Sequence, residues 1–130
     1  MKPLELYLHI PFCISKCKYC DFLSAPSEFQ ERQDYVESLC RDIRSYRNLA
    51  EAYVVVSIFL GGGTPSVLTP AQIKDIFKSI KETFQLSGEA EITIEMNPGT
   101  VDKEKLRTYR EVGINRLSIG LQSALDEELK

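Results

Sequence analysis

The sequence predicts an α/β fold built on a parallel sheet, equivalent to about the first four units of a TIM-like (β/α) barrel. Strand-like and helix-like segments alternate along the whole chain, in the order that βαβ units require. The run YVVVSIFL is almost continuously apolar, as is typical of a parallel strand covered on both faces. The connections suit right-handed crossovers. A complete eight-unit barrel takes roughly 250 residues, so this chain corresponds to about half of one.

The first unit combines a short strand with an amphipathic helix. Residues 4–10, LELYLHI, are strand-like, and a cysteine-rich loop follows them. Ser27 and Gln30 have the spacing of a capping box, which predicts that the helix starts there. The helix then places four apolar side chains at i, i+3, i+4 and i+7, namely Val36, Leu39, Cys40 and Ile43. Cys40 is therefore expected to be a buried structural thiol.

The second unit begins with the apolar strand at residues 53–60, which ends in the sequence GGGTPS. Thr69, Pro70 and Gln72 have the residue types of the N-cap, N1 and N3 positions of a helix. The expected core face of this helix consists of Ile73, Ile76, Phe77, Ile80 and Phe84.

The third strand is expected at residues 91–97, EITIEMN, after a separating Gly88. Side chains alternate between the two faces of a strand. One face would carry Ile92, Ile94 and Met96, and the other would carry Glu91, Thr93 and Glu95. The last of these, Glu95, lies near the end of the strand.

The remaining segments predict a third helix and a fourth strand. Asp102 is placed to cap the helix, and Gly113 is placed to end it. The apolar side chains of this helix are Leu106, Tyr109 and Val112. The strand is expected within residues 114–123, INRLSIGLQS, and a further helix begins before Lys130. A fourth strand without a neighbour would expose unpaired backbone groups, so we expect the natural protein to continue beyond this point.

Composition excludes several classes of protein. The chain is 43% apolar and 27% charged, which is an ordinary globular composition, and its net charge of −3 carries no basic patch for nucleic acid. Glu5 and His9 interrupt the N-terminal apolar run, so we expect no secretory signal, and no later run is long enough to span a membrane. These features favour a cytoplasmic protein, in which clustered cysteines act as metal ligands or catalytic thiols more often than as disulfides.

Three cysteines, Cys13, Cys17 and Cys20, are concentrated in the stretch HIPFCISKCKYCDF. Iron–sulfur cubes normally use four cysteines, one for each iron. Three cysteines would leave one iron open, and an open coordination position indicates chemistry at the metal. A structural zinc site with His9 as the fourth ligand is the alternative, although a strand histidine that is hydrogen-bonded beneath the loop explains His9 more simply.

Five motifs together resemble the radical S-adenosylmethionine (radical SAM) family. The motifs are CISKCKYC, which has the CxxxCxxC form, and YLHIPFC, GGGTPS, EMNPGT and GINRLSIGLQS, which follow the family order. They are most similar to the branch that contains oxygen-independent coproporphyrinogen III oxidases and the HemW-type heme chaperones. The resemblance covers residues 4–123, and it implies that residues 1–130 are the N-terminal part of a radical SAM core domain. The rest of the barrel and a C-terminal domain would be absent.

The resemblance implies that Cys13, Cys17 and Cys20 hold a 4Fe-4S cluster whose fourth iron binds S-adenosylmethionine. In the family, an electron from the cluster cleaves the sulfonium bond to give methionine and a 5'-deoxyadenosyl radical. The cofactor would also contact Tyr7 near the sulfonium, Tyr19 near the adenine, Gly62, Gly63 and Thr64 around the methionine amino group, Glu95 at the ribose, and Gln122.

These positions also have a physical interpretation of their own. GGGTPS follows a buried strand, so it is expected at the carboxyl end of the sheet, where ligand sites form. Consecutive glycines let the backbone approach a ligand closely, although a plain turn is the alternative. A phosphate-binding P-loop is excluded because no lysine follows at the required spacing. The alternative for Tyr7 is a half-buried strand aromatic, and the alternative for Glu95 is a solvated carboxylate.

One departure from the oxidase pattern bears on activity. The oxidase branch continues its cluster motif as CxxxCxxCxC, whereas this chain has Phe22 at the last position. The ending CxxCDF resembles the chaperones, which implies a protein that binds heme and delivers it to an acceptor protein. An oxidase that converts propionate side chains of a porphyrin to vinyl groups is the alternative, so enzyme activity stays open. An electron donor and a heme-acceptor protein are the expected partners, and a zinc-stabilised module is the third hypothesis.

Overall fold

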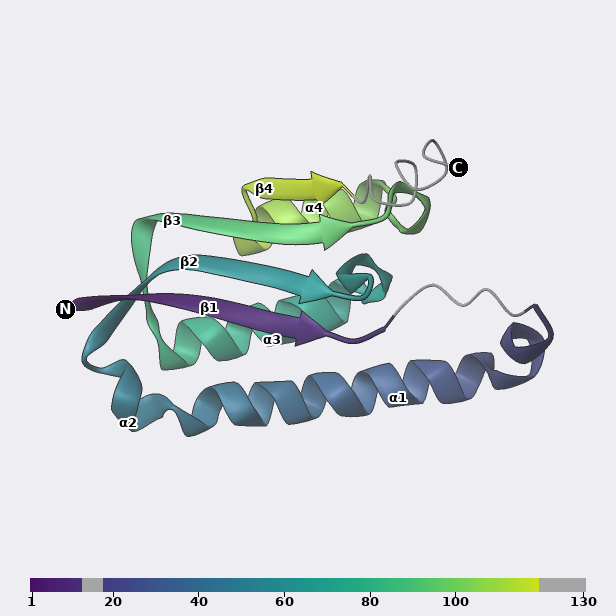
Figure 1. Ribbon diagram of the computed structural model, residues 1–130, viewed down its shortest axis with the longest axis horizontal. Helices are drawn as coiled ribbons and strands as arrows, with labels where there is room; N and C mark the ends of the chain where they lie inside the picture. Colours follow the sequence, from purple (N-terminus) through teal and green to yellow (C-terminus); the bar gives the residue numbers. More distant parts are fainter. Residues whose placement is uncertain (13–17, 120–130) are drawn as a thin grey trace, which may run out of the picture.

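The computed structural model describes residues 1–12 and 18–119, and it contains a four-stranded parallel sheet (Figure 1). The strands follow the chain in the order β1-β2-β3-β4. Their bounds are Lys2–Ile10 for β1, Tyr53–Gly62 for β2, Gln85–Met96 for β3 and Arg116–Ile119 for β4. All three neighbouring pairs are parallel. The predicted α/β class, with consecutive β/α units as in the first part of a barrel, is confirmed.

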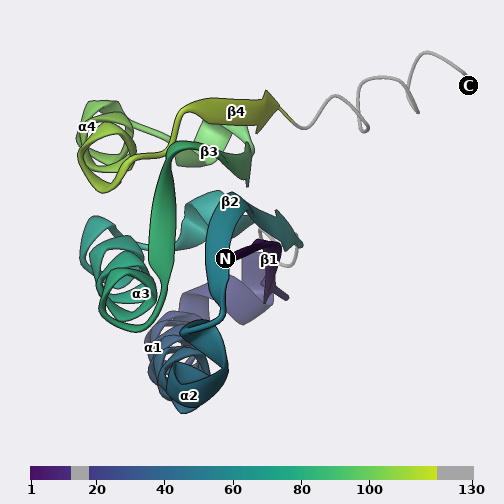
Figure 2. The same ribbon diagram turned by 90° about the vertical axis from the view of Figure 1, so that its left-hand side faces the viewer.

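The helices all cover the same face of the sheet (Figure 2). They are α1 (Lys18–Ser45), α2 (Arg47–Ala50), α3 (Pro70–Thr83) and α4 (Lys103–Val112), and two 3-10 turns, η1 (Pro65–Val67) and η2 (Pro98–Thr100), follow β2 and β3. The opposite face of the sheet, called the open face below, carries Tyr7, His9, Phe59 and Glu95. Within residues 1–12 and 18–119, none of the helices combines the length and apolarity that a membrane crossing needs.

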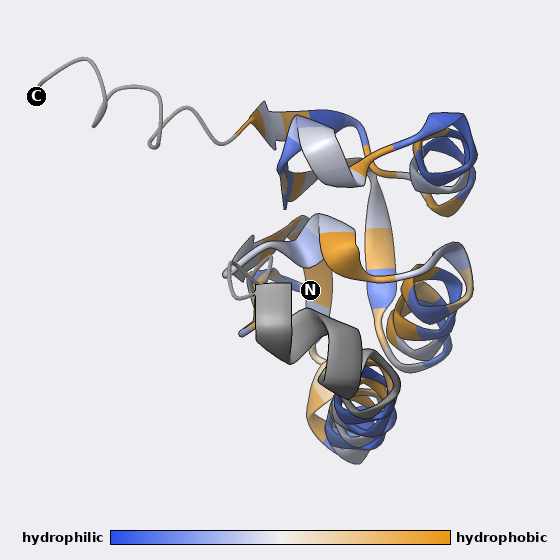
Figure 3. Ribbon diagram, turned by 90° about the vertical axis from the view of Figure 1, so that its right-hand side faces the viewer, coloured by the Kyte–Doolittle hydropathy of each residue, from blue (hydrophilic) through white to orange (hydrophobic). Residues whose placement is uncertain are grey.

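The hydrophobic core lies between the sheet and the helices, where apolar strand residues meet the apolar sides of the helices (Figure 3). Leu8 and Ile10 point into it from β1, whereas Tyr7 and His9 alternate to the open face. The predicted helix residues Val36, Cys40 and Ile43 are buried. The predicted core residues of α3, namely Ile73, Ile76, Phe77 and Ile80, are buried as well, and so is Phe84 directly after the helix.

Local capping signals were accurate for α3 and α4. The Thr69 hydroxyl accepts from the Gln72 N–H at 3.2 Å, and the Thr69 N–H donates to Gln72 Oε1 at 2.9 Å. Asp102 accepts from the N–H of Lys105 at 2.8 Å. Gly113 ends α4 in the left-handed region, with φ of 103°. The predicted starts of both helices and the predicted stop of α4 are therefore confirmed.

Two sequence-based expectations about the elements were wrong. Helix α1 begins at Lys18, well before Ser27, because a capping pattern contributes only about 1 kcal/mol and does not prevent an earlier start. Strand β3 begins at Gln85, because Gln85 and Leu86 already pair with Val54 and Val55 of β2. The register then shifts, and residues 87–90, which include Gly88, lie between the two paired stretches of β3. Of the apolar side chains of α4, Tyr109 and Val112 are buried, whereas Leu106 is 43% exposed and lines a groove beside β4.

Tyr109 provides a test of how α4 packs. The side chain is 2% exposed, and its hydroxyl has no hydrogen-bond partner among the described residues. Burial and the nearby Asp102 carboxylate raise the pKa of Tyr109 to about 12, against about 10 in an unfolded chain. Between these values the unfolded state releases the phenolic proton and the folded state keeps it, so this stabilisation is complete below pH 10 and is lost as the pH rises to 12.

We expect Tyr109→Phe to flatten the alkaline loss of stability. The difference between the variant and wild type should change by up to about 1.4 kcal/mol per pH unit between pH 10 and 12, less where solvent screens the hydroxyl. Below pH 9 the variant should be at least as stable as wild type, because no hydrogen bond within the described residues is lost. Urea unfolding from pH 8 to 12 measures both effects, and parallel pH profiles for the two proteins would contradict the assignment.

Candidate functional site

The carboxyl ends of β1, β2 and β3 lie along one edge of the sheet, where parallel barrels place their ligand sites. The pairing register aligns His9 with Gly61 and Ile10 with Gly62. On the other side of β2, Leu60 is aligned with Ile94, and therefore Glu95 of β3 lies beside the glycines. Segments that are far apart in the sequence thus meet here, as the motifs predicted.

A hydrogen bond between the glycine loop and β3 forms the centre of this site. The Gly62 N–H donates to Oε1 of Glu95 at 2.9 Å. Glu95 is partly buried on the open face of the sheet. The main-chain bond holds the carboxylate in one place, and its second oxygen makes no hydrogen bond to the residues that the structure describes.

The glycines are required by space as well as by backbone conformation. Gly62 has φ of 115°, which disfavours other residues. A Cβ atom there would lie 2.7 Å from the His9 ring and 2.9 Å from the Ile10 carbonyl oxygen. A Cβ atom on Gly61 would lie 2.5 Å from Glu95 Oε1. The loop therefore approaches both neighbouring strands more closely than any side chain would allow.

The rest of the glycine loop is joined to the end of β1. The Gly63 N–H donates to the Ile10 carbonyl oxygen at 2.8 Å, and the Thr64 N–H donates to the Phe12 carbonyl oxygen. These bonds continue the strand pairing past the end of β1. The predicted cofactor residues Gly62, Gly63 and Thr64 are therefore brought together with Glu95 and with the chain segment that leads to the cysteines.

Tyr7 lies on the open face of β1, and its pairing partner on β2, Phe59, is two residues before Gly61. Its side chain is 55% exposed and stacks on the Phe59 ring, with 6.0 Å between the ring centroids. Its hydroxyl lies 3.3 Å from Nδ1 of His9. The structure thus places Tyr7 on the open face of β1, where its ring packs on a neighbouring strand, and a role for Tyr7 at the cofactor stays a prediction.

The sequence reasoning missed Tyr35, a residue of α1 that supports the site. Its hydroxyl donates to the carbonyl oxygen of His9, and its ring packs edge-on against Phe12 at 5.4 Å. Burial raises the pKa of Tyr35, and the Asp42 and Tyr7 charges act in the same direction. In the sequence, the available signal was its position four residues before Leu39, at the margin of the apolar stripe.

Several predicted site residues lie outside what the structure describes. Cys13, Cys17 and Gln122 fall within residues 13–17 and 120–130. The backbone of Tyr19 and Cys20 belongs to the first turn of α1, instead of the loop that the sequence suggested. Among the described side chains, no three metal-binding groups come together. The ligand roles of the cysteines therefore stay predictions.

The chemistry of the described groups fits the cofactor that the motifs imply. S-adenosylmethionine carries an ammonium group and two ribose hydroxyls, all of which are hydrogen-bond donors. A carboxylate has several acceptor positions, and the hydrogen bond from Gly62 uses one of them. Glu95 could therefore accept further hydrogen bonds from a ligand that binds at the glycine loop.

Gly62→Ala should destabilise the protein strongly, because alanine at a φ of 115° is strained and its Cβ atom would clash with His9 and the Ile10 carbonyl group. Backbone strain alone costs about 1–3 kcal/mol. Gly88→Ala is the matched control, since no atom lies within 4 Å of the added Cβ position. Urea unfolding should show a large loss of stability for the first variant and little change for the second. Equal midpoints would contradict this account of the loop.

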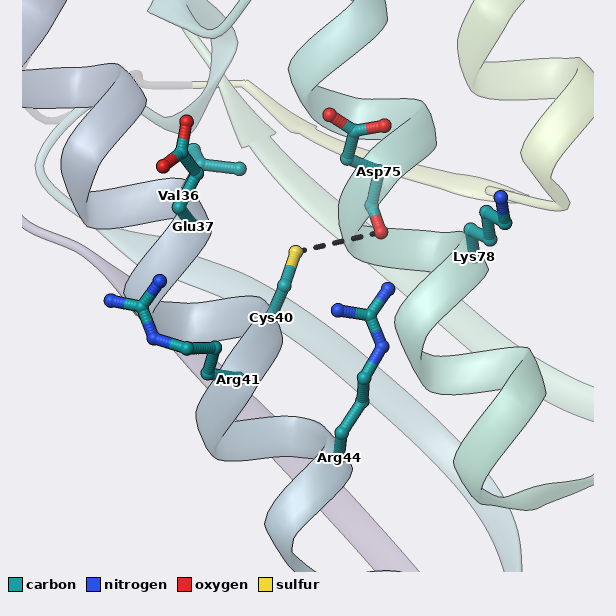
Figure 4. Close-up of a pocket in the computed structure, with 7 residues that line it drawn as sticks. All are labelled: Val36, Glu37, Cys40, Arg41, Arg44, Asp75 and Lys78. Atoms are coloured by element: carbon teal, nitrogen blue, oxygen red, sulfur yellow. Dashed lines mark hydrogen bonds between the residues drawn. The ribbon is translucent and has the colours of Figure 1, made fainter.

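A cleft between α1 and α3 is separate from this site (Figure 4). It has a volume of about 330 Å³ and contains the Cys40 thiol, which donates to the Asp75 carbonyl oxygen at 3.5 Å. Cys40 is 6% exposed. The expectation that this cysteine is a buried structural thiol is confirmed, and the cleft is part of helix–helix packing on the outer side of the sheet.

Comparison with known families gives one match that covers nearly the whole chain. The family model described as the Radical SAM superfamily matches residues 7–130. In a structural comparison, the coproporphyrinogen III oxidase (HemN) of Escherichia coli, described as a radical SAM enzyme, superimposes with a TM-score of 0.75 and 34% identity. The match covers 91% of this chain and 27% of that protein.

Curated relatives include heme chaperones. The "Heme chaperone HemW" of Escherichia coli (strain K12) is 41% identical over 131 aligned positions, covering 100% of this chain and 35% of the relative. The mitochondrial "Radical S-adenosyl methionine domain-containing protein 1" of Danio rerio is 34% identical, covering 97% of this chain and 28% of the relative. The chain thus spans about a third of the length of the curated relatives it matches.

Proposed function

Because the chain belongs to the radical SAM superfamily, which implies a 4Fe-4S cluster and S-adenosylmethionine, we propose that it binds both at the carboxyl edge of its sheet. Cys13, Cys17 and Cys20 would hold three irons of the cluster, and the fourth iron would stay open for S-adenosylmethionine. The observation that supports this proposal best is the Glu95 carboxylate, which the Gly62 N–H holds beside the glycine loop.

The protein would bind and orient the cofactors, which supply one-electron radical chemistry. In this proposal Glu95 accepts from the ribose hydroxyls, and the backbone of Gly62, Gly63 and Thr64 contacts the methionine amino group. The exposed Tyr7 ring would lie near the sulfonium. Tyr19 and Gln122 would contact the rest of the cofactor.

The broader function that we propose is that of a heme chaperone. Two observations support it, the identity of 41% to a protein named as a heme chaperone and the presence of Phe22 where the oxidase pattern has a fourth cysteine. The protein would bind heme and transfer it to an acceptor protein, with an electron donor serving the cluster. Phenylalanine has no thiol, so it cannot perform the function of that fourth cysteine.

An oxygen-independent coproporphyrinogen III oxidase is the second candidate, which the structural similarity to the Escherichia coli oxidase favours. Titration with hemin and a coproporphyrinogen turnover assay on the reconstituted protein separate the two. The chaperone proposal expects saturable heme binding, seen as a shifted Soret band, and no vinyl product. Vinyl product formation would overturn it in favour of the oxidase.

The cofactor proposal has its own test. Protein reconstituted without oxygen should contain about four irons and four sulfides for each chain. Adding S-adenosylmethionine should alter the electronic spectrum of the cluster, because the ligand binds directly to iron. Purified protein that contains zinc, or a cluster that does not respond to S-adenosylmethionine, would overturn the proposal and favour the zinc module.

A further inference from the structure

A side chain of α4 connects the two loops that carry the candidate site. The Lys105 ammonium donates to the carbonyl oxygen of Ser66 in η1 and to the carbonyl oxygen of Thr100 in η2, both at 2.7 Å. This distance is at the short end of the range for charge-assisted hydrogen bonds. One cation thus bridges the loop that follows β2 and the loop that follows β3.

Side chains of the two loops strengthen the connection. The Ser66 hydroxyl accepts from the Asn97 N–H at 3.0 Å. The Thr100 hydroxyl donates to the Asn97 carbonyl oxygen at 2.7 Å, so its hydrogen is already used and the Ser66 hydroxyl must donate to Thr100 Oγ1. Ser66 is fully buried. The hydrogen bonds of this hydroxyl are therefore shielded from water, and shielding strengthens a hydrogen bond.

This set of contacts, called the Lys105 clamp, is connected to the site by short stretches of chain. Ser66 is four residues after Gly62, and Asn97 is two residues after Glu95. The hydrogen bond from Gly62 to Glu95 joins the same two segments of chain. A shift of η1 relative to η2 would therefore move the glycine backbone relative to the carboxylate.

The surroundings of Lys105 shift its pKa downward. Burial lowers the pKa of Lys105, the Asp102 carboxylate partly opposes this, and the Arg32 guanidinium lowers the pKa further. The ion pairs found among the described residues involve other side chains. The main-chain carbonyl groups of the two loops are thus the direct partners of this ammonium. A plain anchoring role for α4 is the simpler interpretation, and the test below separates the two.

We propose that Lys105 is a positioning residue for the S-adenosylmethionine site, because its clamp sets the distance between the glycine loop and Glu95. The inference rests on the proposed function, since it takes these two elements as the cofactor site. Lys105 itself makes no hydrogen bond to Gly62 or Glu95. It acts through Ser66, Thr100 and Asn97.

The test compares Lys105→Met, which removes the donors, with Lys105→Arg, which keeps the charge and several donors. Lys103→Met is the matched control, since Lys103 is an exposed residue of the same helix. In the cofactor-free protein, Lys105→Met should accelerate amide hydrogen exchange in residues 61–67 and 95–100 while leaving α3 unchanged. In Lys103→Met the exchange rates should equal those of wild type. In Lys105→Arg they should be close to those of wild type.

The second readout is cofactor affinity of the reconstituted protein. Lys105→Met should keep the iron content and thermal midpoint of wild type, while the dissociation constant of S-adenosylmethionine, followed through the cluster spectrum, rises about tenfold or more. Lys105→Arg should recover most of the affinity. Unchanged affinity in Lys105→Met would overturn the proposal. A lower affinity that is accompanied by a lower iron content and a lower thermal midpoint would overturn it as well, because it would indicate general destabilisation. A wild-type cluster that does not respond to S-adenosylmethionine would instead overturn the proposed function.

Discussion

Single replacements of Cys13, Cys17 or Cys20 by alanine should each abolish assembly of the iron–sulfur cluster. Each cysteine is proposed to hold one iron, and the fourth iron is already without a protein ligand, so two thiolates cannot retain the cube. Iron and sulfide content after anaerobic reconstitution should fall from about four of each for every chain to near zero. The visible absorbance of the cluster should disappear with it.

Cys40→Ala is the matched control for these variants. The Cys40 thiol is buried between α1 and α3, and it donates to a main-chain carbonyl group there. Its loss should lower stability slightly, through a small cavity, and leave the iron content unchanged. Loss of iron in the Cys40 variant, or full iron in any of the other three, would contradict the ligand assignment.

Glu95→Gln should weaken binding of S-adenosylmethionine by one to two orders of magnitude while the cluster stays intact. The amide keeps an oxygen that can accept from the Gly62 N–H, so the loop should keep its geometry. It loses the negative charge, and hydrogen bonds to charged groups contribute about 1.5–3 kcal/mol. Titration of the reconstituted variant with S-adenosylmethionine, followed through the cluster spectrum, measures the effect.

The control for this prediction is Glu89→Gln, which makes the same chemical change at an exposed position of β3. Its affinity for S-adenosylmethionine should equal that of wild type. If Glu95→Gln also binds like wild type, the carboxylate is a solvated strand residue and the cofactor lies elsewhere. A parallel loss of affinity in both variants would indicate a general effect of charge instead of a contact.

Much of the fold was predictable from patterns within short stretches of sequence. The capping box at Thr69, the cap at Asp102 and the stop at Gly113 depend on residues within one helical turn, and all three are confirmed. The buried residues of α3 follow from their spacing alone. The start of α1 was wrong, because a favourable local cap at Ser27 does not exclude a longer helix.

The candidate site was predictable in part. The glycine loop and Glu95 could be named because both lie at the carboxyl ends of predicted parallel strands, and the carboxyl ends of such strands share an edge. Their hydrogen bond, at 2.9 Å, depends on the register between β2 and β3. That register includes a shift between Val55 and Ser57, and no periodicity in the sequence indicates it.

The chain's own residue pattern thus established the alternation of strands and helices, the starts of α3 and α4, the end of α4 and the core-facing sides of α1 and α3, because these depend on neighbours along the chain. Folding in three dimensions decided which distant groups meet. The Tyr35 hydroxyl on the His9 carbonyl oxygen and the Lys105 ammonium between η1 and η2 each join residues of different elements. Such contacts depend on how whole elements pack and pair, and short-range sequence patterns contain no information about that.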